Sequence, residues 1–449
     1  MARVLCIDTF SNALDLLMRA QAAGHSVKWY DKSKKDGSRP TAGNGIVPKI
    51  EDFSELQRKW LDWADLIWLP DNTAYLDMLE PYRRRGYPIF GPSPDAARLE
   101  LDREAGQKAF RDAGLAVIDG KTFHDYKDAI RYVEKENKAF VSKPSGDADK
   151  ALSYVAKTPA DLVFMLERWA KNPDYVRMAR KDGFILQEKV TGTEMAVGGH
   201  FGPGGWSKWF VENFEHKKLF PGDMGPNTGE MGTLTRCVRK SKLADEVLLP
   251  LTPILEDLGY VGYIDNNCII EENGKPRPLE LTMRDGWPLK HNITAMMRGD
   301  PVQWMIDLVH GTDSIEAVEG QCCVSVVIAL PPFPYQHVVR KDLDGIPVYN
   351  AHDTDHVHLS EVRLGADVPQ MEGEAMLRAP SFVTSGEYPL VVTGCGPTVS
   401  AARRSAYSAV RKIEIPNDPF YRQDIGAPKR LLEGIPRIQA MGYAKGLVL

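Results

Sequence analysis

Gly225-Pro226-Asn227-Thr228-Gly229-Glu230-Met231-Gly232-Thr233 is the stretch of this chain that says most about its fold and chemistry. Three glycines, a proline and an asparagine within nine residues are incompatible with a regular helix or a central strand. The stretch predicts a tight, preformed loop with backbone N–H groups free to meet an anion or a polar ligand. A glycine-rich surface turn explains it equally well in isolation, so the surrounding sequence decides. The charged cluster Glu215-His216-Lys217-Lys218 leads directly into the loop.

Composition predicts a soluble protein built from several packed units. With 449 residues, the chain is expected to form about two to four such units. The net charge of −5 argues against a protein that coats nucleic acid. No apolar run approaches the ~18 residues of a bilayer-crossing helix, and the N-terminus is too quickly polar for a signal peptide. Six scattered cysteines without a CxxC pair favour free thiols in a reducing cytoplasm over disulfides or zinc.

The first 101 residues alternate short apolar strands with helical stretches, a rhythm that predicts a parallel α/β domain. Its expected strands are Val4 to Ile7, Ser26 to Tyr30, Leu66 to Leu69 and Pro88 to Phe90, and its first helix is Leu14 to Ala23. One continuous helix is expected over Asp95 to Ala113.

From about residue 116 the pattern becomes mixed, typical of an α+β core. The expected elements are strands at Ala139 to Lys143, Ala148 to Ala156 and Phe184 to Lys189, a helix at Pro159 to Ala170, and a helical stretch from Leu243 to Leu258 that Pro250 and Pro253 kink or break. The segments Tyr260 to Glu271 and Lys275 to Leu281 predict a hairpin joined at Asn273-Gly274. A last unit begins near Gln321 with a strand over Cys322 to Leu330 and ends in a helix over Val399 to Lys412.

Four features that can carry chemistry follow one another along the chain. Lys143 ends an apolar strand beside a turn with Gly146, where it can place a positive charge on a phosphate. Gln187 to Val190 can present backbone groups to an adenine edge, and Glu194 can bind ribose hydroxyls. The 225–233 loop is the third feature.

The fourth feature is the predicted hairpin, whose strands carry oxygen ligands. Strand alternation places Asp265 with Asn267 on one face, and Glu280 with Thr282 on one face. Carboxylates in otherwise apolar strands are costly unless they are paired or coordinated. The hairpin therefore predicts a site for a hard cation such as Mg²⁺.

Taken together, these features resemble the ATP-grasp ligases, and more narrowly the glycinamide ribonucleotide synthetases (phosphoribosylamine–glycine ligases). The 225–233 loop matches that family's GPNTGGMG motif at all but one position, where Glu230 replaces a glycine. Glu215-His216-Lys217 resembles its DHK, Ile89-Phe90-Gly91-Pro92-Ser93 its IFGPT, and Tyr421-Arg422-Gln423-Asp424-Ile425-Gly426 its YRKDIG. The resemblance implies a pre-ATP-grasp domain over 1–101, a two-lobed ATP-grasp core over 102–318 with its small lobe at about 118–188, and a small mixed α/β C-terminal domain over 319–449.

The resemblance also implies a reaction and a set of residues. A carboxylate, glycine in that family, attacks the γ-phosphate of ATP bound with Mg²⁺ or Mn²⁺, and an amine then displaces phosphate from the acyl phosphate. The catalytic residues would be Arg284, Lys143 and Asn227. ATP would be bound by Arg103, Lys143, Glu188, Lys189, Val190, Glu194 and Lys217, and the metal by Glu280, Asp265 and Thr282. The substrates would contact Gly225, Pro226, Thr228, Gly229, Met231, Asp71, Asn72 and Trp287. The partners expected are these small molecules, with the chain a monomer or a homodimer.

Several positions depart from the family pattern. The glycine-rich loop that holds the phosphate of phosphoribosylamine is replaced by Asp8-Thr9-Phe10-Ser11-Asn12, in which an acidic residue would repel a phosphate. Leu69-Pro70-Asp71-Asn72 stands in place of a GPE motif, Lys150-Ala151-Leu152 in place of GKG, and Asp285 to Leu289 in place of FGDPE. Three readings stay open: ligation of glycine to phosphoribosylamine with Ser11 and Asn12 replacing the lost glycines, the same chemistry on another amine such as a modified nucleotide or base, and a nucleotide-binding module without catalysis.

Overall fold

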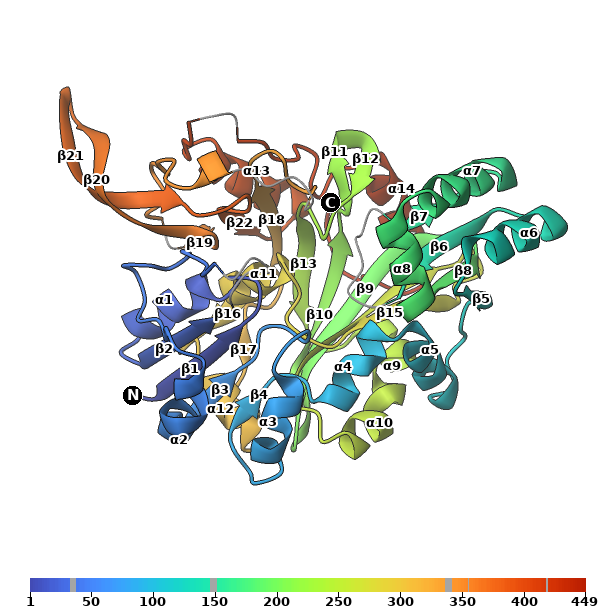
Figure 1. Cartoon of the computed structure of the whole chain (residues 1–449), viewed down its shortest axis with the longest axis horizontal. Helices are drawn as coiled ribbons and strands as arrows, with labels where there is room; N and C mark the ends of the chain where they lie inside the picture. Colours follow the sequence, from blue (N-terminus) through green and yellow to red (C-terminus); the bar gives the residue numbers. More distant parts are fainter. Residues whose placement is uncertain (33–37, 146–151, 336–340, 354, 417–418) are drawn as a thin grey trace.

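The computed structural model of the chain describes residues 1–32, 38–145, 152–335, 341–353, 355–416 and 419–449. An eight-stranded sheet runs through the middle of the molecule, with a four-stranded sheet and its helices on either side (Figure 1). No helix among the described residues is long and apolar enough to span a membrane. All six cysteines are free, as the sequence predicts.

The N-terminal segment forms the predicted parallel sheet, with strand order β2-β1-β3-β4. Its strands are β1 Arg3–Asp8, β2 Ser26–Asp31, β3 Leu66–Trp68 and β4 Ile89–Phe90. Its helices are α1 Leu14–Ala22, the π-helix η1 Leu56–Trp60, α2 Leu61–Trp63 and α3 Leu76–Arg83. Because parallel strands end at one sheet edge, Asp8 and Asp31 lie opposite each other at the carboxyl ends of β1 and β2.

The single helix predicted over 95–113 is wrong, since two helices occupy this segment. They are α4 Pro94–Leu101 and α5 Arg103–Asp112. Asp102 between them is extended, and its carboxylate accepts hydrogen bonds from the backbone N–H groups of Glu104 and Ala105. An acidic N-cap satisfies free helix donors, so the chain restarts at Arg103, which then points from the first turn of α5.

The small lobe is a four-stranded sheet in the order β5-β8-β6-β7. Its strands are β5 Gly120–Phe123, β6 Phe140–Pro144, β7 Tyr154–Val155 and β8 Phe184–Glu188, and its helices are α6 Tyr126–Glu136, α7 Pro159–Ala170 and α8 Pro173–Asp182. The predicted turn at Gly146 and residues 148–151 of the strand predicted over 148–156, which include Lys150 and Ala151, lie outside the described residues. Within the described remainder, 152–156, only Tyr154–Val155 forms a strand. Helices α6 and α7 lie at the far right of Figure 1.

The central sheet has eight strands in the order β15-β14-β9-β10-β13-β18-β22-β19. They are β9 Thr193–Gly202, β10 Gly205–Glu215, β13 Thr233–Val238, β14 Gly262–Ile270, β15 Pro276–Thr282, β18 Cys322–Ile328, β19 Val357–Leu359 and β22 Leu390–Gly396. The predicted hairpin is confirmed as β14 and β15. Strands β18, β19 and β22 follow residue 318, so the sheet continues across the predicted boundary of the C-terminal domain; the boundary itself stays a prediction.

The remaining helices flank the central sheet or close the chain. They are α9 Lys242–Val247, η4 Leu249–Leu251, α10 Thr252–Asp257, α11 Leu289–Met296, α12 Gln303–Val309, η5 Lys341–Leu343, α13 Val399–Val410 and α14 Lys429–Ala440. The predicted break near Pro250 and Pro253 is confirmed by the three short helices α9, η4 and α10.

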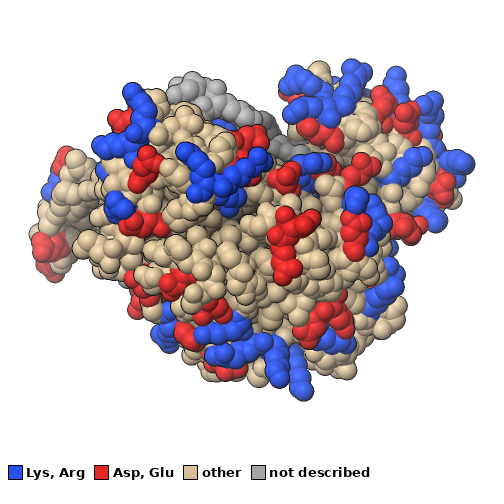
Figure 2. Space-filling view, turned by 90° about the horizontal axis from the view of Figure 1, so that it is seen from below, with Lys and Arg blue, Asp and Glu red and all other residues tan. Residues whose placement is uncertain are grey.

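Three two-stranded ribbons complete the fold. They pair β11 Lys218–Phe220 with β12 Met224–Asn227, β16 Met297–Arg298 with β17 Glu316–Ala317, and β20 Val362–Glu372 with β21 Ala375–Thr384. The face of the molecule seen from below carries acidic and basic side chains interspersed (Figure 2). This mixing matches the small net charge and gives no broad basic field on that face for a nucleic acid.

Candidate active site

A short connector joins the two lobes where the sequence places it. Strand β8 of the small sheet ends at Glu188, and β9 of the central sheet begins at Thr193. The Glu188 side chain is exposed, with its carboxylate 3.5 Å from Lys138 Nζ. Lys189 Nζ donates to the Ala156 carbonyl at 3.2 Å, which ties the connector to the small lobe. The adenine contacts of Glu188, Lys189 and Val190 stay a prediction.

The register of the central sheet collects polar side chains on one face. Across the β14–β15 hairpin, Asp265 pairs with Thr282 and Asn267 pairs with Glu280. Directly opposed residues of antiparallel strands project to the same side, and so do residues two apart. On the next strand, Glu194 of β9 pairs with Ile269 and therefore joins this face. The predicted alternation is thus confirmed, with Asn267 as the residue opposite Glu280.

Cations and carboxylates alternate around Glu280. One of its oxygens accepts a short hydrogen bond from Arg103, and the other lies 3.5 Å from Lys217 Nζ. The same Lys217 Nζ lies 2.8 Å from Glu215 and 3.7 Å from Glu194. Burial lowers the pKa of Lys217, but the three carboxylates outweigh it and hold that pKa well above its usual value. Lys217 therefore stays charged.

Lys143, at the end of β6, has a lowered pKa and loses its positive charge at a lower pH than an ordinary lysine. Burial, together with the charges of Arg103 and Lys217, lowers the pKa of Lys143 to about 8 against the opposing effect of Glu280 and Glu194. Three cations thus converge on Glu280 from β6, α5 and the loop after β10. An added polyanion such as a triphosphate would stabilise all three charges.

The oxygen atoms on this face fit a hard cation. Asn267 donates from Nδ2 to Glu215 at 2.7 Å and to Glu194 at 3.2 Å. Its Oδ1 is buried and accepts no hydrogen bond among the described residues, which leaves a carbonyl-type ligand beside the Glu280 carboxylate. Carboxylate and amide oxygens are ligands that Mg²⁺ accepts.

Asp265 lies on the same face but is engaged differently from the prediction. Its Oδ2 accepts hydrogen bonds from Asn213 and Tyr263, both at 2.8 Å. Burial, with the charge of Glu215, raises the pKa of Asp265 to about 7, against these hydrogen bonds. Asn267 therefore stands nearer than Asp265 to the ligand position opposite Glu280, and metal binding by Asp265 and Thr282 stays a prediction.

The 225–233 segment differs from the free loop that the sequence predicts. Met224–Asn227 forms strand β12, paired with β11 in an isolated ribbon, where glycine and proline are tolerated because the ribbon has no further neighbours. The N–H groups of Thr228 and Met231 donate to the carbonyls of Lys217 and His216, so these two are not free for an anion. Thr228 and Met231 are buried, which makes direct substrate contact by their side chains a poor fit.

The side chains of Asn227 and Glu230, in the same segment, have different surroundings. Asn227 Nδ2 donates to the Ser153 carbonyl at 3.1 Å and so links the ribbon to the small lobe. Glu230, which replaces the family glycine, is buried, and its Oε1 has no hydrogen-bond partner among the described residues. Burial raises the pKa of Glu230 well above its usual value, and the charge of Glu215 adds to the effect. Gly225, Pro226 and Gly229 stay predicted substrate contacts.

Arg284 lies at the junction with the N-terminal domain. Its guanidinium lies 3.2 Å from Glu100 Oε1 of α4, while Glu100 Oε2 accepts from Asn72 Nδ2 at 2.8 Å and from the Met283 N–H. Burial lowers the pKa of Arg284, but Glu100 and Asp71 outweigh it and raise that pKa. The structure thus brings the predicted residues Arg284, Asp71 and Asn72 into one network. Glu100 joins them although no motif marked it.

In the loop after β1, backbone N–H groups donate to the side chain of Asp8, the last residue of that strand. Asp8 is fully buried and accepts hydrogen bonds from the N–H groups of Phe10 at 3.0 Å and Ala13 at 2.9 Å. These donors precede α1, where a bound phosphate would otherwise find them. Ser11 Oγ donates to Asp31 at 2.7 Å. Burial raises the pKa of Asp8 to about 7, and the charge of Asp31 adds to this effect.

The charged and polar residues that meet around Glu280 are called here the ATP-side cluster: Lys143, Arg103, Lys217, Glu280, Glu194, Glu215 and Asn267. From the sequence, Asn267 is placed on the hairpin but not among the expected metal ligands, and Glu215 has no separate role. The partner of Asn267 could not be found by counting back from Asn273-Gly274, because the register shifts between Asn267 and Cys268, and this shift places Asn267 opposite Glu280. Glu215 shares the face of Lys217 only through the end of β10, for which the sequence holds no separate signal.

Comparison with known proteins agrees with this geometry. Residues 104–289 match the family model of the phosphoribosylglycinamide synthetase ATP-grasp (A) domain. This match spans the small lobe, the connector, the 225–233 segment and the hairpin with Glu280. The match supports the prediction, made from the sequence motifs, that the chain is an ATP-grasp ligase.

Two relatives of known name indicate which ATP-grasp ligase this chain resembles. It is 27% identical over 375 residues to phosphoribosylamine–glycine ligase of Pseudomonas aeruginosa, covering 80% of this chain and 81% of that protein. It is 25% identical over 366 residues to the enzyme of the same name from Ralstonia nicotianae, covering 80% and 82%. The chain therefore resembles phosphoribosylamine–glycine ligase.

Solved structures support the fold. The crystal structure of phosphoribosylamine–glycine ligase from Thermotoga maritima matches with a TM-score of 0.70 at 21% identity, over 94% of this chain and 100% of that one. An L-amino acid ligase from Bacillus licheniformis matches with a TM-score of 0.56 at 13% identity, over 93% and 99%. The predicted ATP-grasp architecture is confirmed.

Proposed function

We propose that this protein joins the carboxylate of glycine to an amine in an ATP-dependent reaction through an acyl phosphate. The observation that carries the proposal is the convergence of Lys143, Arg103 and Lys217 on Glu280, on the sheet face reached from the connector. A triphosphate at this point would meet three cations and the oxygen ligands of a divalent ion. The glycine assignment rests on the relatives named above.

The cationic residues and the oxygen-bearing residues of the site would have separate roles in the reaction. Lys143 and Arg103 would hold the phosphate oxygens, so that charge gained by the transferred phosphoryl group is neutralised. Glu280 and Asn267 would hold Mg²⁺, which draws electron density from the phosphate oxygens. Arg284 would orient the glycine carboxylate for attack on the γ-phosphorus. ADP leaves, the amine nitrogen attacks the acyl carbon, and phosphate departs as the amine loses a proton.

The loop before α1, where the resembled family binds the phosphate of its acceptor amine, departs from the family motif in this chain. The Asp8 carboxylate accepts the two backbone N–H groups that would otherwise hold a phosphate, and Ser11 is bonded to Asp31. Replacement of the lost glycines by Ser11 is therefore disfavoured. We propose that the acceptor is recognised without a phosphate before α1, as a neutral or cationic amine would be.

The first experiment tests acyl-phosphate formation without knowledge of the acceptor. Hydroxylamine replaces the amine, and glycyl hydroxamate and ADP are measured with ATP, Mg²⁺ and glycine. We expect both products from the native enzyme and from Lys135→Ala, an exposed control in the small lobe, and neither from Glu280→Gln. Absence of both products with glycine and with every other amino acid supplied would refute the ligase proposal and favour a nucleotide-binding module.

The second experiment tests the acceptor. Freshly made phosphoribosylamine is supplied with ATP and glycine, beside a panel of phosphate-free primary amines. We expect turnover with a member of the panel and little with phosphoribosylamine. Product formation from phosphoribosylamine at about 1–10 s⁻¹, an ordinary enzymatic rate, would refute the acceptor proposal and leave the ligase proposal standing.

A further inference from the structure

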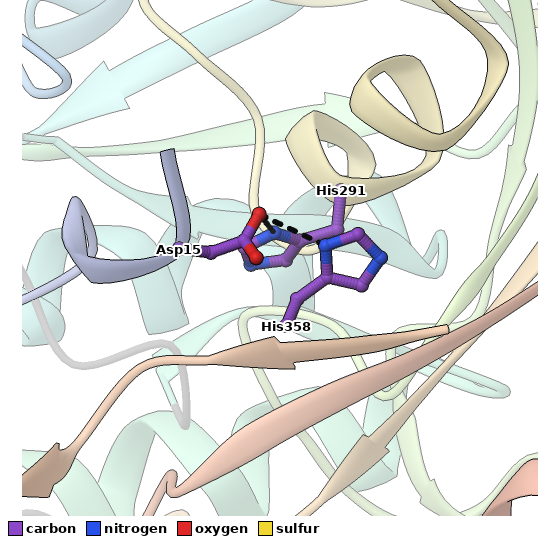
Figure 3. A group of neighbouring side chains, drawn as sticks. All are labelled: Asp15, His291 and His358. Atoms are coloured by element: carbon purple, nitrogen blue, oxygen red, sulfur yellow. Dashed lines mark hydrogen bonds and ion pairs between the residues drawn. The ribbon is translucent and has the colours of Figure 1, made fainter. Parts of the chain in front are cut away.

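Three buried side chains from distant parts of the sequence meet away from the ATP-side cluster. Asp15 lies in the first turn of α1, His291 in α11 and His358 in β19 (Figure 3). One ligand atom from each lies within 4.8 Å of the others. Each comes from a different predicted domain, so their meeting is created by the tertiary fold alone.

His291 is the member with the longest contact to the carboxylate of the group. It is 1% exposed, and neither ring nitrogen has a hydrogen-bond partner among the described residues. Its Nδ1 lies 3.7 Å from Asp15 Oδ2, beyond hydrogen-bonding distance, and its ring centroid is 4.8 Å from that of His358. A buried imidazole without a hydrogen-bond partner destabilises the native state, so its place requires a reason.

His358 is held in the orientation that a metal ligand needs. Its Nε2 lies 2.8 Å from Thr393 Oγ1, and its Nδ1 faces Asp15 Oδ2 at 2.9 Å. A histidine ligand is commonly fixed through its second nitrogen by such an outer contact. A cation would replace the contact between His358 Nδ1 and Asp15 Oδ2, with Nδ1 and the carboxylate as ligands.

Arg19 completes the surroundings of the carboxylate. Its Nε donates to both Asp15 oxygens at 3.1 and 3.0 Å, and its side chain is 23% exposed. Asp15 and Arg19 both line a cavity of about 450 Å³, which Trp304 and Phe382 also line. The cavity reaches the group at Asp15 and not at the two histidines, so a cation would enter past Asp15 and Arg19.

We propose that Asp15, His291 and His358 form a binding site for a transition-metal dication, with Zn²⁺ the natural first probe. Two imidazoles and one carboxylate suit such ions, whereas the oxygen-rich face at Glu280 suits Mg²⁺. The remaining coordination positions would open to water on the side of the cavity. A bound ion would join α1, α11 and β19 and so stabilise the native arrangement of the three segments.

The test uses the full-length protein after chelation and exchange into buffer with excess Mg²⁺, which saturates oxygen sites. Zn²⁺ is titrated by calorimetry, and Co²⁺ is followed by its ligand-field absorption. We expect one equivalent of either ion and a higher melting temperature with Zn²⁺. His291→Gln should weaken binding more than about 100-fold, beyond the 10–100-fold typical of outer-shell changes. His310→Gln, an exposed histidine on the last turn of α12, is the matched control.

His291→Gln is the decisive variant because, within the described part of the chain, His291 makes no hydrogen bond and its contact with Asp15 is 3.7 Å long. Asp15→Asn and His358→Gln follow, each checked for folding by circular dichroism. The proposal is overturned if the native protein binds no Zn²⁺ or Co²⁺ beyond the amount that His291→Gln binds. It is also overturned if Co²⁺ gives the same ligand-field absorption spectrum with the native protein and with His291→Gln. Either result would leave Arg19, Asp15 and His358 as a structural ion-pair network only.

Discussion

Lys143 offers the sharpest test of the ATP-side cluster because its charge is predicted to depend on pH within the working range. Burial, with Arg103 and Lys217 nearby, lowers its pKa to about 8. A bound triphosphate would restore the charged form and raise the pKa. Nucleotide binding should therefore be tightest below pH 8, where Lys143 is already charged, and weaken as pH rises through 8.

The magnitude follows from the titration. With a free-protein pKa of about 8 and a bound-state pKa above 10, the dissociation constant should rise about tenfold from pH 7 to pH 9. At pH 8 about half a proton should be taken up for each nucleotide bound. Lys143→Ala should lose about 1.5–3 kcal/mol of binding free energy at pH 7, the range for a charge-assisted hydrogen bond, and should lose the pH dependence.

Calorimetry with a non-hydrolysable ATP analogue and Mg²⁺ at pH 7, 8 and 9 measures both quantities. Two buffers of different ionisation enthalpy give the proton uptake. Lys135→Ala, an exposed lysine of α6, should behave as the native protein. The reasoning about Lys143 is refuted if Lys143→Ala keeps the native affinity at pH 7, or if it keeps the native slope between pH 7 and pH 9.

Three further outcomes are expected. Glu280→Gln should reduce ADP release at least about 10³-fold while circular dichroism stays native, since one neutralised ligand leaves the fold intact; retained turnover would remove Glu280 from the site. Arg422→Ala should cost about 3–5 kcal/mol in urea unfolding, because Arg422 is fully buried between Asp223 and Asp424, and a loss below 1 kcal/mol would contradict this. Burial raises the pKa of Asp31 to about 6, so the folded state binds more protons than the unfolded state. The free energy of unfolding should therefore fall as the pH rises from 4 to 7, by on the order of 2–3 kcal/mol more in the unsubstituted protein than in Asp31→Asn. Equal slopes in the two proteins would refute this argument.

The sequence by itself determined the local elements and the class of enzyme. Alternation and the Asn273-Gly274 turn were sufficient for the β14–β15 hairpin, because side-chain direction has a period of two along a strand. The helix over Pro159–Ala170 was predicted to the residue, since Thr158 and Pro159 mark its start. Where a local signal was ambiguous the prediction failed. Asp102 could continue a helix or cap a new one, and it caps.

Only the tertiary structure decided which residues meet. Glu280 finds Arg103 across 177 positions, and Asp15 finds His358 across 343. No local sequence pattern predicts contacts between residues so far apart in the sequence, because these contacts depend on the order in which the strands join the sheets. The same holds for Asp8. In the sequence it is an acid where a phosphate loop was expected, and only the fold shows its carboxylate accepting the backbone N–H groups before α1. A side chain's chemistry is local, but its partner is set by the packing of the whole chain.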